Sequence, residues 1–206
     1  MDQTQKARAV ELVEFINSLG FGCALVGGLA VSVRTRPRAT QDVDLAVAVS
    51  TDKDAERVGF QLCQHGYRLR DTLEDTNTGY VSTLRLNHPR DPHDTEEPSV
   101  DLLFSSSGIE GEVVAAASSI RSLSGGEVPV AQLPHLIAMK VLSECDERPK
   151  DREDLRALIR AASKAQLDQA TELVVLIEQR GYHRNKELQP LLCSLIRQHQ
   201  ARGHSE

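Results

Sequence analysis

GGLAV at residues 27–31 and RATQDVDL at residues 38–45 decide the fold of this chain. The apolar residues 21–26 predict a short buried strand, which the glycine pair interrupts, and a new helix is predicted from Leu29. A strand, a glycine turn and a helix in such close succession aim backbone N–H groups at whatever lies above the turn. The first stretch therefore predicts a turn suited to binding an anion.

The second stretch carries two acidic residues, Asp42 and Asp44, in a predicted strand. Valine and leucine occupy the odd positions from 43 to 49, so both carboxylates project from the opposite face. Aspartate is among the poorest strand formers, and two carboxylates on one face repel each other unless a cation lies between them. A hard divalent ion with oxygen ligands removes that repulsion. The pair therefore predicts a metal site.

A third carboxylate, Asp101, lies in a later predicted strand, where the apolar residues Val100, Leu102 and Phe104 alternate with it. On a strand next to the paired aspartates it would complete a metal cradle. Two ions roughly 3.5–4 Å apart can activate an attacking oxygen and neutralise the leaving one. Taken alone, Asp101 fits equally well a solvent-exposed acid at a sheet edge.

The glycine turn, the paired aspartates and the later aspartate, in this order, resemble the signature of the DNA-polymerase-β-like nucleotidyltransferase superfamily. The Gly-Gly and Thr-x-Asp-x-Asp forms are similar to its branch of AbiEii-type and minimal nucleotidyltransferase toxins. The resemblance implies an α/β (α+β) fold, with a mixed, twisted sheet of about four to six strands and helices on one side. A C-terminal helical lobe would close the cleft. We expect a core at residues 1–130 and this lobe at residues 131–206.

The resemblance also implies a nucleotidyltransferase, which moves a nucleoside monophosphate from an NTP to an acceptor hydroxyl. Two Mg²⁺ ions, or Mn²⁺ in their place, would be bound by the catalytic residues Asp42, Asp44 and Asp101. Asp42 and Asp44 would hold both ions. Asp101 would hold the ion nearer the acceptor and help to deprotonate its hydroxyl.

The triphosphate site departs from the superfamily pattern at one position. Many members have Gly-Ser at the turn, with the serine hydroxyl touching a phosphate, whereas this chain has Gly27 followed by Gly28. Backbone N–H groups, helped by Thr40 or Arg38, would have to hold the triphosphate instead. Arg34, Arg36 and Arg38 fit phosphate contacts and solvated surface charges equally well.

Lys140 lies in the middle of the apolar face of a predicted helix at residues 133–145. Its ammonium either reaches the edge of the core or contacts a nucleotide phosphate or an active-site carboxylate. On the next helix Asp151, with Asp154, either caps the helix or belongs to the site. Lys140 and the Lys-Asp-x-x-Asp-Leu run at residues 150–155 resemble elements of the same toxin branch. That resemblance implies that Lys140 and Asp151 are catalytic and that Lys140 also binds the nucleotide.

The remaining segments predict ordinary elements. Residues 7–19 predict an amphipathic helix, and Thr51 can cap a helix whose inner positions include Cys63. Strands are predicted at residues 67–70 and 80–86, followed by a mobile hairpin loop at residues 87–98. The last predicted helices lie at residues 151–162, 167–179 and 188–199.

The composition restricts the function. A net charge of −6, a pI near 5.7 and 3% aromatic residues argue against a general nucleic-acid binder. The 4 cysteines lie far apart, which indicates reduced thiols rather than a zinc site. No stretch is long and apolar enough for a signal peptide or a membrane span, so we expect a cytoplasmic protein with no membrane partner.

The acceptor is predicted from local charge and from the resemblance. A tRNA or other RNA end is the predicted acceptor, because cationic residues gather at the proposed cleft and would attract its phosphates. The resemblance implies that the protein acts in a toxin-like role and has a cognate antitoxin as partner. Alternatives are a small aminoglycoside-like acceptor, suggested by the acidic segment at residues 91–97, a protein acceptor, or a catalytically silent nucleotide-binding module. The same cations could instead pair with nearby acids such as Glu144. The cations are Arg34, Arg36, Arg38, Lys140, Arg148, Lys150, Arg152 and Arg156.

Overall fold

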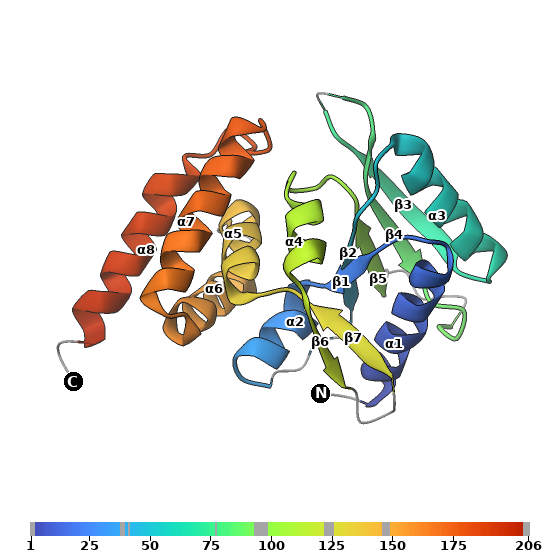
Figure 1. Cartoon of the computed structure of the whole chain (residues 1–206), viewed down its shortest axis with the longest axis horizontal. Coiled ribbons are helices and arrows are strands. Elements are labelled where there is room, and N and C mark those ends of the chain that lie inside the picture. Colours follow the sequence, from blue (N-terminus) through green and yellow to red (C-terminus); the bar gives the residue numbers. More distant parts are fainter. Residues whose placement is uncertain are drawn as a thin grey trace.

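The structure is a computed structural model that describes residues 3–37, 40, 42–76, 78–92, 99–121, 126–145 and 149–203. Figure 1 shows how its helices and strands are arranged. In chain order they are α1 (Gln3–Ser18), β1 (Cys23–Leu25), α2 (Gly27–Arg34), β2 (Val43–Val47), α3 (Asp52–Gln64), β3 (Arg68–Glu74), β4 (Val81–Asn87), β5 (Val100–Leu103), α4 (Glu110–Ala116), β6 (Ser118–Arg121), β7 (Glu127–Val130), α5 (Leu133–Ser143), α6 (Pro149–Ala161), α7 (Lys164–Gln179) and α8 (Leu188–Gly203).

The described strands form one seven-stranded sheet in the order β3-β4-β5-β2-β1-β7-β6. β2 runs parallel to β5 and β1 runs parallel to β7, whereas all other neighbouring strands are antiparallel. This arrangement confirms the predicted α/β fold, with a mixed sheet followed by C-terminal helices. The expected strand number was too low, because β6 and β7 extend the sheet beyond β1. β6, with the sequence SSIR, has a single large apolar residue and therefore no alternation to reveal it.

The apolar face of β2 is buried under helices. Val43, Leu45 and Val47 have no exposed surface, and α1 packs against β1, β2 and β7. The alternating residues Asp44 and Ala46 project from the other face of the strand. This strand therefore separates the core beneath α1 from the side of the sheet that carries the acidic residues.

Local capping explains where α3 begins. The hydroxyl of Thr51 accepts a hydrogen bond from the backbone N–H of Asp54, and the Asp54 carboxylate accepts one from the N–H of Thr51. This capping box confirms the predicted helix start. Cys63, expected on the inner face, is exposed instead, because Ala55, Val58 and Leu62 fill the buried stripe.

The segment after β4 begins as an anchored turn. Asp91 accepts a hydrogen bond from the N–H of His88 at 2.8 Å and pairs with Arg8 of α1 at 2.8 Å. The hydroxyl of Ser99 also donates to Asp91. Residues 93–98 of the predicted mobile loop lie outside the described residues. The described start of that loop is tied to α1 through Asp91, and the mobility of the loop stays a prediction.

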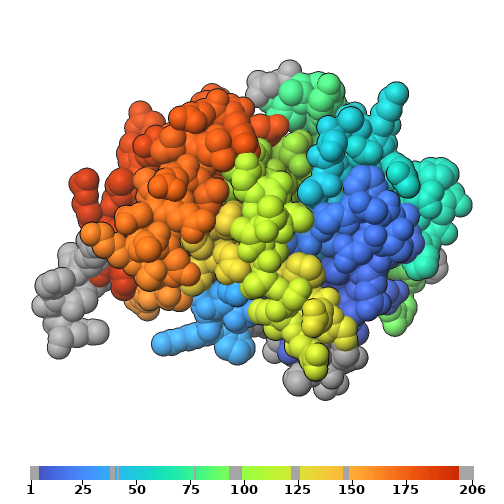
Figure 2. Space-filling model, viewed as in Figure 1, coloured from blue at the N-terminus to red at the C-terminus, as the bar shows by residue number. Residues whose placement is uncertain are grey.

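The four helices predicted for the C-terminal part are all present as α5, α6, α7 and α8. α5 contacts the three others, and α2 joins this bundle to the sheet by packing on α5 and α6. Figure 2 shows α7, in orange, lying against the α4 segment, in yellow-green, on the visible face. In the described part of the chain no helix is long and apolar enough to span a membrane. The four cysteines are free thiols.

Candidate active site

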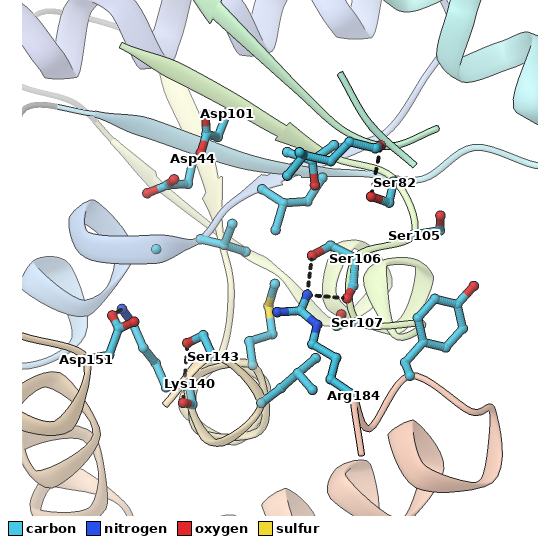
Figure 3. A pocket seen from close by; sticks show the side chains of 18 of the residues that line it. Asp44, Ser82, Asp101, Ser105, Ser106, Ser107, Lys140, Ser143, Asp151 and Arg184 are labelled. Carbon is cyan, nitrogen blue, oxygen red and sulfur yellow. Dashed lines mark hydrogen bonds and ion pairs between the residues drawn. The ribbon is translucent and has the colours of Figure 1, made fainter. Parts of the chain in front are cut away.

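A cleft of about 1400 Å³ lies between the sheet and the C-terminal helices, and Figure 3 shows part of its lining. Sheet residues form one wall, and α5 with the α7–α8 turn forms the other. Arg38, predicted to bind the nucleotide, lies outside the described residues. All other residues that the sequence nominated for the site line this one cleft: Gly27, Gly28, Thr40, Asp42, Asp44, Asp101, Lys140 and Asp151.

Asp44 and Asp101 face each other across neighbouring strands. They are register partners in the parallel pair of β2 and β5, and both side chains are partly buried at the cleft wall. Arg85 of β4 is the next register partner in the same row, and its Nε lies 3.7 Å from Oδ2 of Asp101. Asp42, two residues before Asp44 on the same face, is exposed. The three predicted carboxylates therefore lie on one surface that opens into the cleft.

Gly27 provides space for the Asp44 carboxylate. Its φ of +59° is in the left-handed region that glycine adopts without strain. A Cβ atom at this position would lie 1.9 Å from Oδ2 of Asp44, which is far inside contact distance. The backbone N–H of Gly28 donates a hydrogen bond to the same carboxylate. The glycine turn therefore holds Asp44, although the sequence suggested that its N–H groups serve the triphosphate.

The environment of Asp44 disfavours its charged form. Burial away from water, followed by repulsion from Asp101 and Asp42, raises the pKa of Asp44 to about 7. The nearby Lys140 ammonium and the Gly28 N–H act in the opposite direction. A buried carboxylate in a cleft with a pKa perturbed in this way is characteristic of a functional site.

The described acidic side chains do not already converge as a closed metal cage. No group of three His, Cys, Asp or Glu side chains among the described residues is gathered tightly enough to count as one. Asp101 lies beside Arg85 and Asp42 is exposed, so the three carboxylates are spread along the cleft wall. The donor set nevertheless fits magnesium, because all three side chains offer carboxylate oxygens from one surface.

Lys140 on α5 binds two carboxylates of α6. Its Nζ forms an ion pair with Asp151 and lies 3.1 Å from Oδ2 of Asp154, with both the lysine and the aspartates largely buried. Figure 3 shows Lys140 and Asp151 together, facing the wall that carries Asp44. The Lys140 ammonium therefore contacts carboxylates, of which Asp151 lines the cleft, and its role in catalysis stays a prediction. Asp154 is 4% exposed, so it does not act as a simple surface cap.

Comparison with known proteins identifies the family. Residues 15–205 match the family described as nucleotidyl transferase AbiEii toxin, type IV TA system. The chain belongs to the AbiEii toxin family. It is therefore a nucleotidyltransferase and a type IV toxin–antitoxin system toxin by family, as the resemblance in the sequence predicted. The AbiEii family, like related nucleotidyltransferases, generally uses divalent metal ions.

Solved structures show that the AbiEii-family chain shares its fold with other nucleotidyltransferases. An antigenic nucleotidyltransferase-like protein from Paracoccidioides brasiliensis matches with a TM-score of 0.52 and 18% identity, over 93% of this chain and 91% of that chain. The antibiotic-resistance factor ANT(2'')-Ia matches with a TM-score of 0.51 and 16% identity, over 87% of this chain and 94% of that chain. At such low identities the likeness concerns the fold alone. No curated protein gives a significant sequence match.

Several cations of the AbiEii-family chain are not placed as the sequence suggested. Arg34 donates to the backbone oxygens of Val130 and Ala131 at 2.7 and 2.8 Å, so it supports the sheet rather than the cleft. Arg152 donates to the Glu144 carboxylate, as the pairing alternative foresaw. Arg148 lies outside the described residues. Of the cations that the sequence singled out, only Lys140 and Lys150 are among the described cleft residues.

Three parts of the cleft were not predicted from the sequence. Arg85 is the single charged residue of β4, whose sequence is VSTLRLN, a signal that a register prediction could have used. The serines at residues 105–107 and the turn at residues 181–185 also line the cleft. They belong to segments without a motif, so only the tertiary structure brings them to the site.

Proposed function

We propose that this AbiEii-family nucleotidyltransferase transfers a nucleoside monophosphate from an NTP to the hydroxyl of an RNA end, foremost of a tRNA. The observation that carries the proposal is the register pair Asp44 and Asp101, which opens into the cleft directly above Gly27. In-line attack of the acceptor oxygen on the α-phosphorus would break the bond to pyrophosphate. Most of the rate would come from positioning and charge neutralisation.

The acidic row would hold two Mg²⁺ ions through Asp42, Asp44 and Asp101, with Mn²⁺ as an alternative. Bound there, the ions would neutralise the charge that develops on the attacking and leaving oxygens. Asp101, farthest along the row, would accept the proton of the acceptor hydroxyl. Arg85, 3.7 Å from Asp101, balances the negative charge of that carboxylate and orients it.

The nucleotide would lie across the glycine turn. Because the Gly28 N–H already serves Asp44, the phosphate contacts would fall to Gly27, to Thr40 and to Arg38. Lys140 lies close enough to Asp44 to influence its pKa and would contact a phosphate from the opposite wall. Asp151 would orient that lysine through their ion pair.

We propose that the two parts of the chain divide these tasks. Residues 1–130 would carry the metals and the triphosphate, and residues 131–206 would close over the nucleotide and meet the acceptor. The packing of α2 on α5 and α6 supports this division, because it connects the two walls of the cleft at the glycine turn. A cognate antitoxin protein would be the natural partner of a toxin of this family.

An RNA acceptor is supported by the size of the cleft and by the toxin family to which the chain belongs. A volume of about 1400 Å³ exceeds the roughly 300–1,000 Å³ of common small-molecule sites, so the cleft has room for more than the nucleotide. Lys150 adds a positive charge at the rim on the α6 side. A protein of net charge −6 could attract a phosphate backbone only through such local positive charges.

A small cationic acceptor is the second candidate. Glu74, at the end of β3, and Asp75, in the β3–β4 turn, line the same cleft, and carboxylates at an acceptor site favour a polyamine such as an aminoglycoside. Of the acidic segment at residues 91–97, which suggested this acceptor in the sequence, Asp91 pairs with Arg8 and is not a cleft residue, and positions 93–97 lie outside the described residues. The two candidates differ in the charge that the acceptor must carry, so they can be separated directly.

The deciding experiment follows a label. The purified protein is incubated with Mg²⁺, a cell extract and each of the four α-labelled NTPs in turn. RNase-sensitive label at the size of tRNA supports the proposal. A small labelled product favours the second candidate, and protease-sensitive label indicates a protein acceptor. Absence of label with every nucleotide and with either metal would refute the proposed transfer.

A further inference from the structure

The cleft wall changes in chemical character along β5. In a strand every second side chain lies on the same face, so Asp101 and Leu103 share the face that lines the cleft, about 7 Å apart. Ser105, two residues further on, also lines the cleft, whereas Phe104 between them is buried. The successive cleft residues of this segment are therefore a carboxylate, an apolar side chain and a hydroxyl.

Leu103 belongs to a row of side chains that lies beside the acidic row. Its register partner on β4 is Thr83, and the partner of Thr83 on β3 is Leu73. These three residues, which we call the uncharged row, all line the cleft, and the opposite wall adds Leu136 and Met139 of α5. A largely apolar surface with a few polar groups at its border is typical of a site for a small organic ligand.

Two hydroxyl groups lie at the border of the uncharged row. The backbone oxygen of Ser82 accepts hydrogen bonds from the N–H of Phe104 at 2.9 Å and from that of Ser105 at 3.4 Å, so the two serines are neighbours. Both line the cleft, and Figure 3 shows them close together and away from Asp101. The acidic row and the two serines therefore lie on either side of Leu103.

The Ser82 hydroxyl can only accept a hydrogen bond from a ligand. A serine has one O–H donor, and that of Ser82 donates to the backbone oxygen of Leu73 at 3.0 Å. The Ser105 hydroxyl likewise donates to the backbone oxygen of Val81 at 3.5 Å. The lone pairs that these serines offer to a ligand therefore fit an N–H donor and disfavour a carbonyl oxygen.

The serine segment after β5 is held on both sides. The N–H and the hydroxyl of Ser107 donate to the buried carboxylate of Glu110 at 2.7 and 2.9 Å. Arg184, in the turn between α7 and α8, donates to the backbone oxygen and the hydroxyl of Ser106 at 2.9 and 3.1 Å. The segment is therefore positioned before a ligand arrives, which lowers the entropic cost of binding.

We propose that the NTP lies along β5, with its base on the uncharged row and an amino group of the base donating to Ser82 and Ser105. Adenine and cytosine carry an amino group at the position where guanine and uracil carry a carbonyl oxygen. The protein therefore selects ATP or CTP over GTP and UTP. This inference rests on the proposed function, which places the phosphates of the NTP at the acidic row.

The terminal base of the acceptor RNA is the other source of the same chemistry. The base of the NTP is favoured because Leu103 lies only two residues from Asp101 on one strand, about 7 Å away. A single ribose, which joins each base to its phosphate, spans such a gap. Binding measured without RNA tests the base of the NTP alone.

Calorimetry with Mg²⁺, without RNA, measures the affinity for a non-hydrolysable analogue of each NTP and for inorganic tripolyphosphate, which has no base. ATP or CTP should bind at least about tenfold more tightly than GTP and UTP, because a carbonyl oxygen would leave buried acceptors without a donor. Purine riboside triphosphate, which is ATP without its amino group, should lose the same factor. The corresponding pyrimidin-2-one nucleotide tests CTP.

Ser82→Ala removes one acceptor and should reduce the preference for the amino group about fivefold, the value of one neutral hydrogen bond. Ser32→Ala is the matched control. The Ser32 hydroxyl is also buried and also donates to a backbone oxygen at 3.0 Å, that of Gly28, but Ser32 is not among the described cleft residues. Ser32→Ala should keep the preference, and both variants should bind tripolyphosphate as the unaltered protein does. Thermal unfolding checks that each variant keeps its fold.

The outcomes separate this inference from the proposed function. GTP or UTP that binds as tightly as ATP and CTP overturns the inference, as does tripolyphosphate that binds as tightly as every NTP. An amino-free nucleotide that binds like its parent overturns it without any variant. Equal losses of preference in Ser82→Ala and Ser32→Ala also overturn it. The transfer itself is judged by the label experiment alone, so it stands if label moves without a base preference and fails if no label moves.

Discussion

A Cβ atom added at Gly27 would lie 1.9 Å from Oδ2 of Asp44. The glycine turn and the paired aspartates, which are separate motifs in the sequence, are therefore one unit in space. The absence of a side chain at Gly27 allows the Asp44 carboxylate to lie against the start of α2 and to accept the Gly28 N–H. This contact positions the central carboxylate of the row, so it should be sensitive to the smallest substitution.

Gly27→Ala should abolish Mg²⁺-dependent transfer, because the added methyl group displaces the Asp44 carboxylate. The left-handed backbone also strains alanine by about 1 kcal/mol. Gly20→Ala is the matched control, since Gly20 has a φ of +89° and no atom within 4 Å of the added Cβ. Both variants should lose a few degrees of melting temperature, and only Gly27→Ala should lose activity. Activity retained in Gly27→Ala would contradict the placement of Asp44.

Asp44→Asn should abolish transfer and yet stabilise the metal-free fold at high pH. The pKa of Asp44 is raised from 3.8 to about 7, so the native state binds this proton more tightly than the unfolded chain does. Between pH 3.8 and about 7, Asp44 loses its proton in the unfolded chain but keeps it in the native state. The free energy of unfolding therefore falls as the pH rises through this range. In EDTA at about pH 8, Asp44→Asn should unfold at a higher denaturant concentration than the unaltered protein, with a smaller difference at about pH 5. A variant that is less stable at both pH values would make Asp44 a structural residue.

Magnesium binding should release a proton below neutral pH. Because Mg²⁺ needs the ionised carboxylate, and the pKa of Asp44 is raised to about 7, the ion must displace a proton at lower pH. The apparent affinity should fall about tenfold for each unit of pH below that value. Calorimetry at about pH 6 in two buffers of different ionisation enthalpy measures the proton released. Asp44→Asn serves as the control, and identical heats in both buffers with the unaltered protein would place the ion elsewhere.

Lys140→Met should impair both stability and catalysis. It removes the ammonium from between Asp151 and Asp154, and breaking a buried ion pair by removing one partner costs about 3–5 kcal/mol. Turnover should fall by tenfold or more, which corresponds to about 1.4 kcal/mol or above. The exposed Lys164→Met, on α7, is the control for the loss of a lysine.

A second substitution separates the two effects of Lys140→Met. Adding Asp154→Leu removes the more deeply buried of the two carboxylates that Lys140 contacts and should recover part of the lost stability, as measured by urea unfolding. Turnover should stay low, because the ammonium that faces Asp44 is still missing. Recovery of turnover together with stability would mean that Lys140 acts only through the fold.

The motif residues show how much the sequence could predict. The alternation around Asp42 and Asp44 predicted β2, and the capping residue Thr51 predicted the start of α3, because both patterns depend on near neighbours in the chain. The α/β fold, the family and the enzyme class were confirmed. The catalytic, nucleotide-binding and metal-binding roles of the nominated residues stay predictions, although all the described ones line one cleft.

Other features escaped the sequence analysis for physical reasons. Nothing local signals β6, because a strand at the sheet edge with polar residues has no apolar alternation. Arg34 was assigned to the cleft by its position near the motif, but its hydrogen bonds run to residues that only folding brings close, Val130 and Ala131. The sequence correctly indicated that Lys140 points inward and needs an anion as partner. It held no signal that could show whether this anion is a phosphate or a carboxylate.

The sequence by itself determined the local geometry: which residues alternate on a strand and where a helix can begin. These properties follow from backbone sterics and from contacts between residues a few positions apart. Only the tertiary structure decided the register that sets Asp44 opposite Asp101, the closeness of Gly27 to Asp44, and the position of Arg184 across the cleft. Each of these joins residues far apart in the chain. Such contacts form only when the whole core packs, and no local pattern records them.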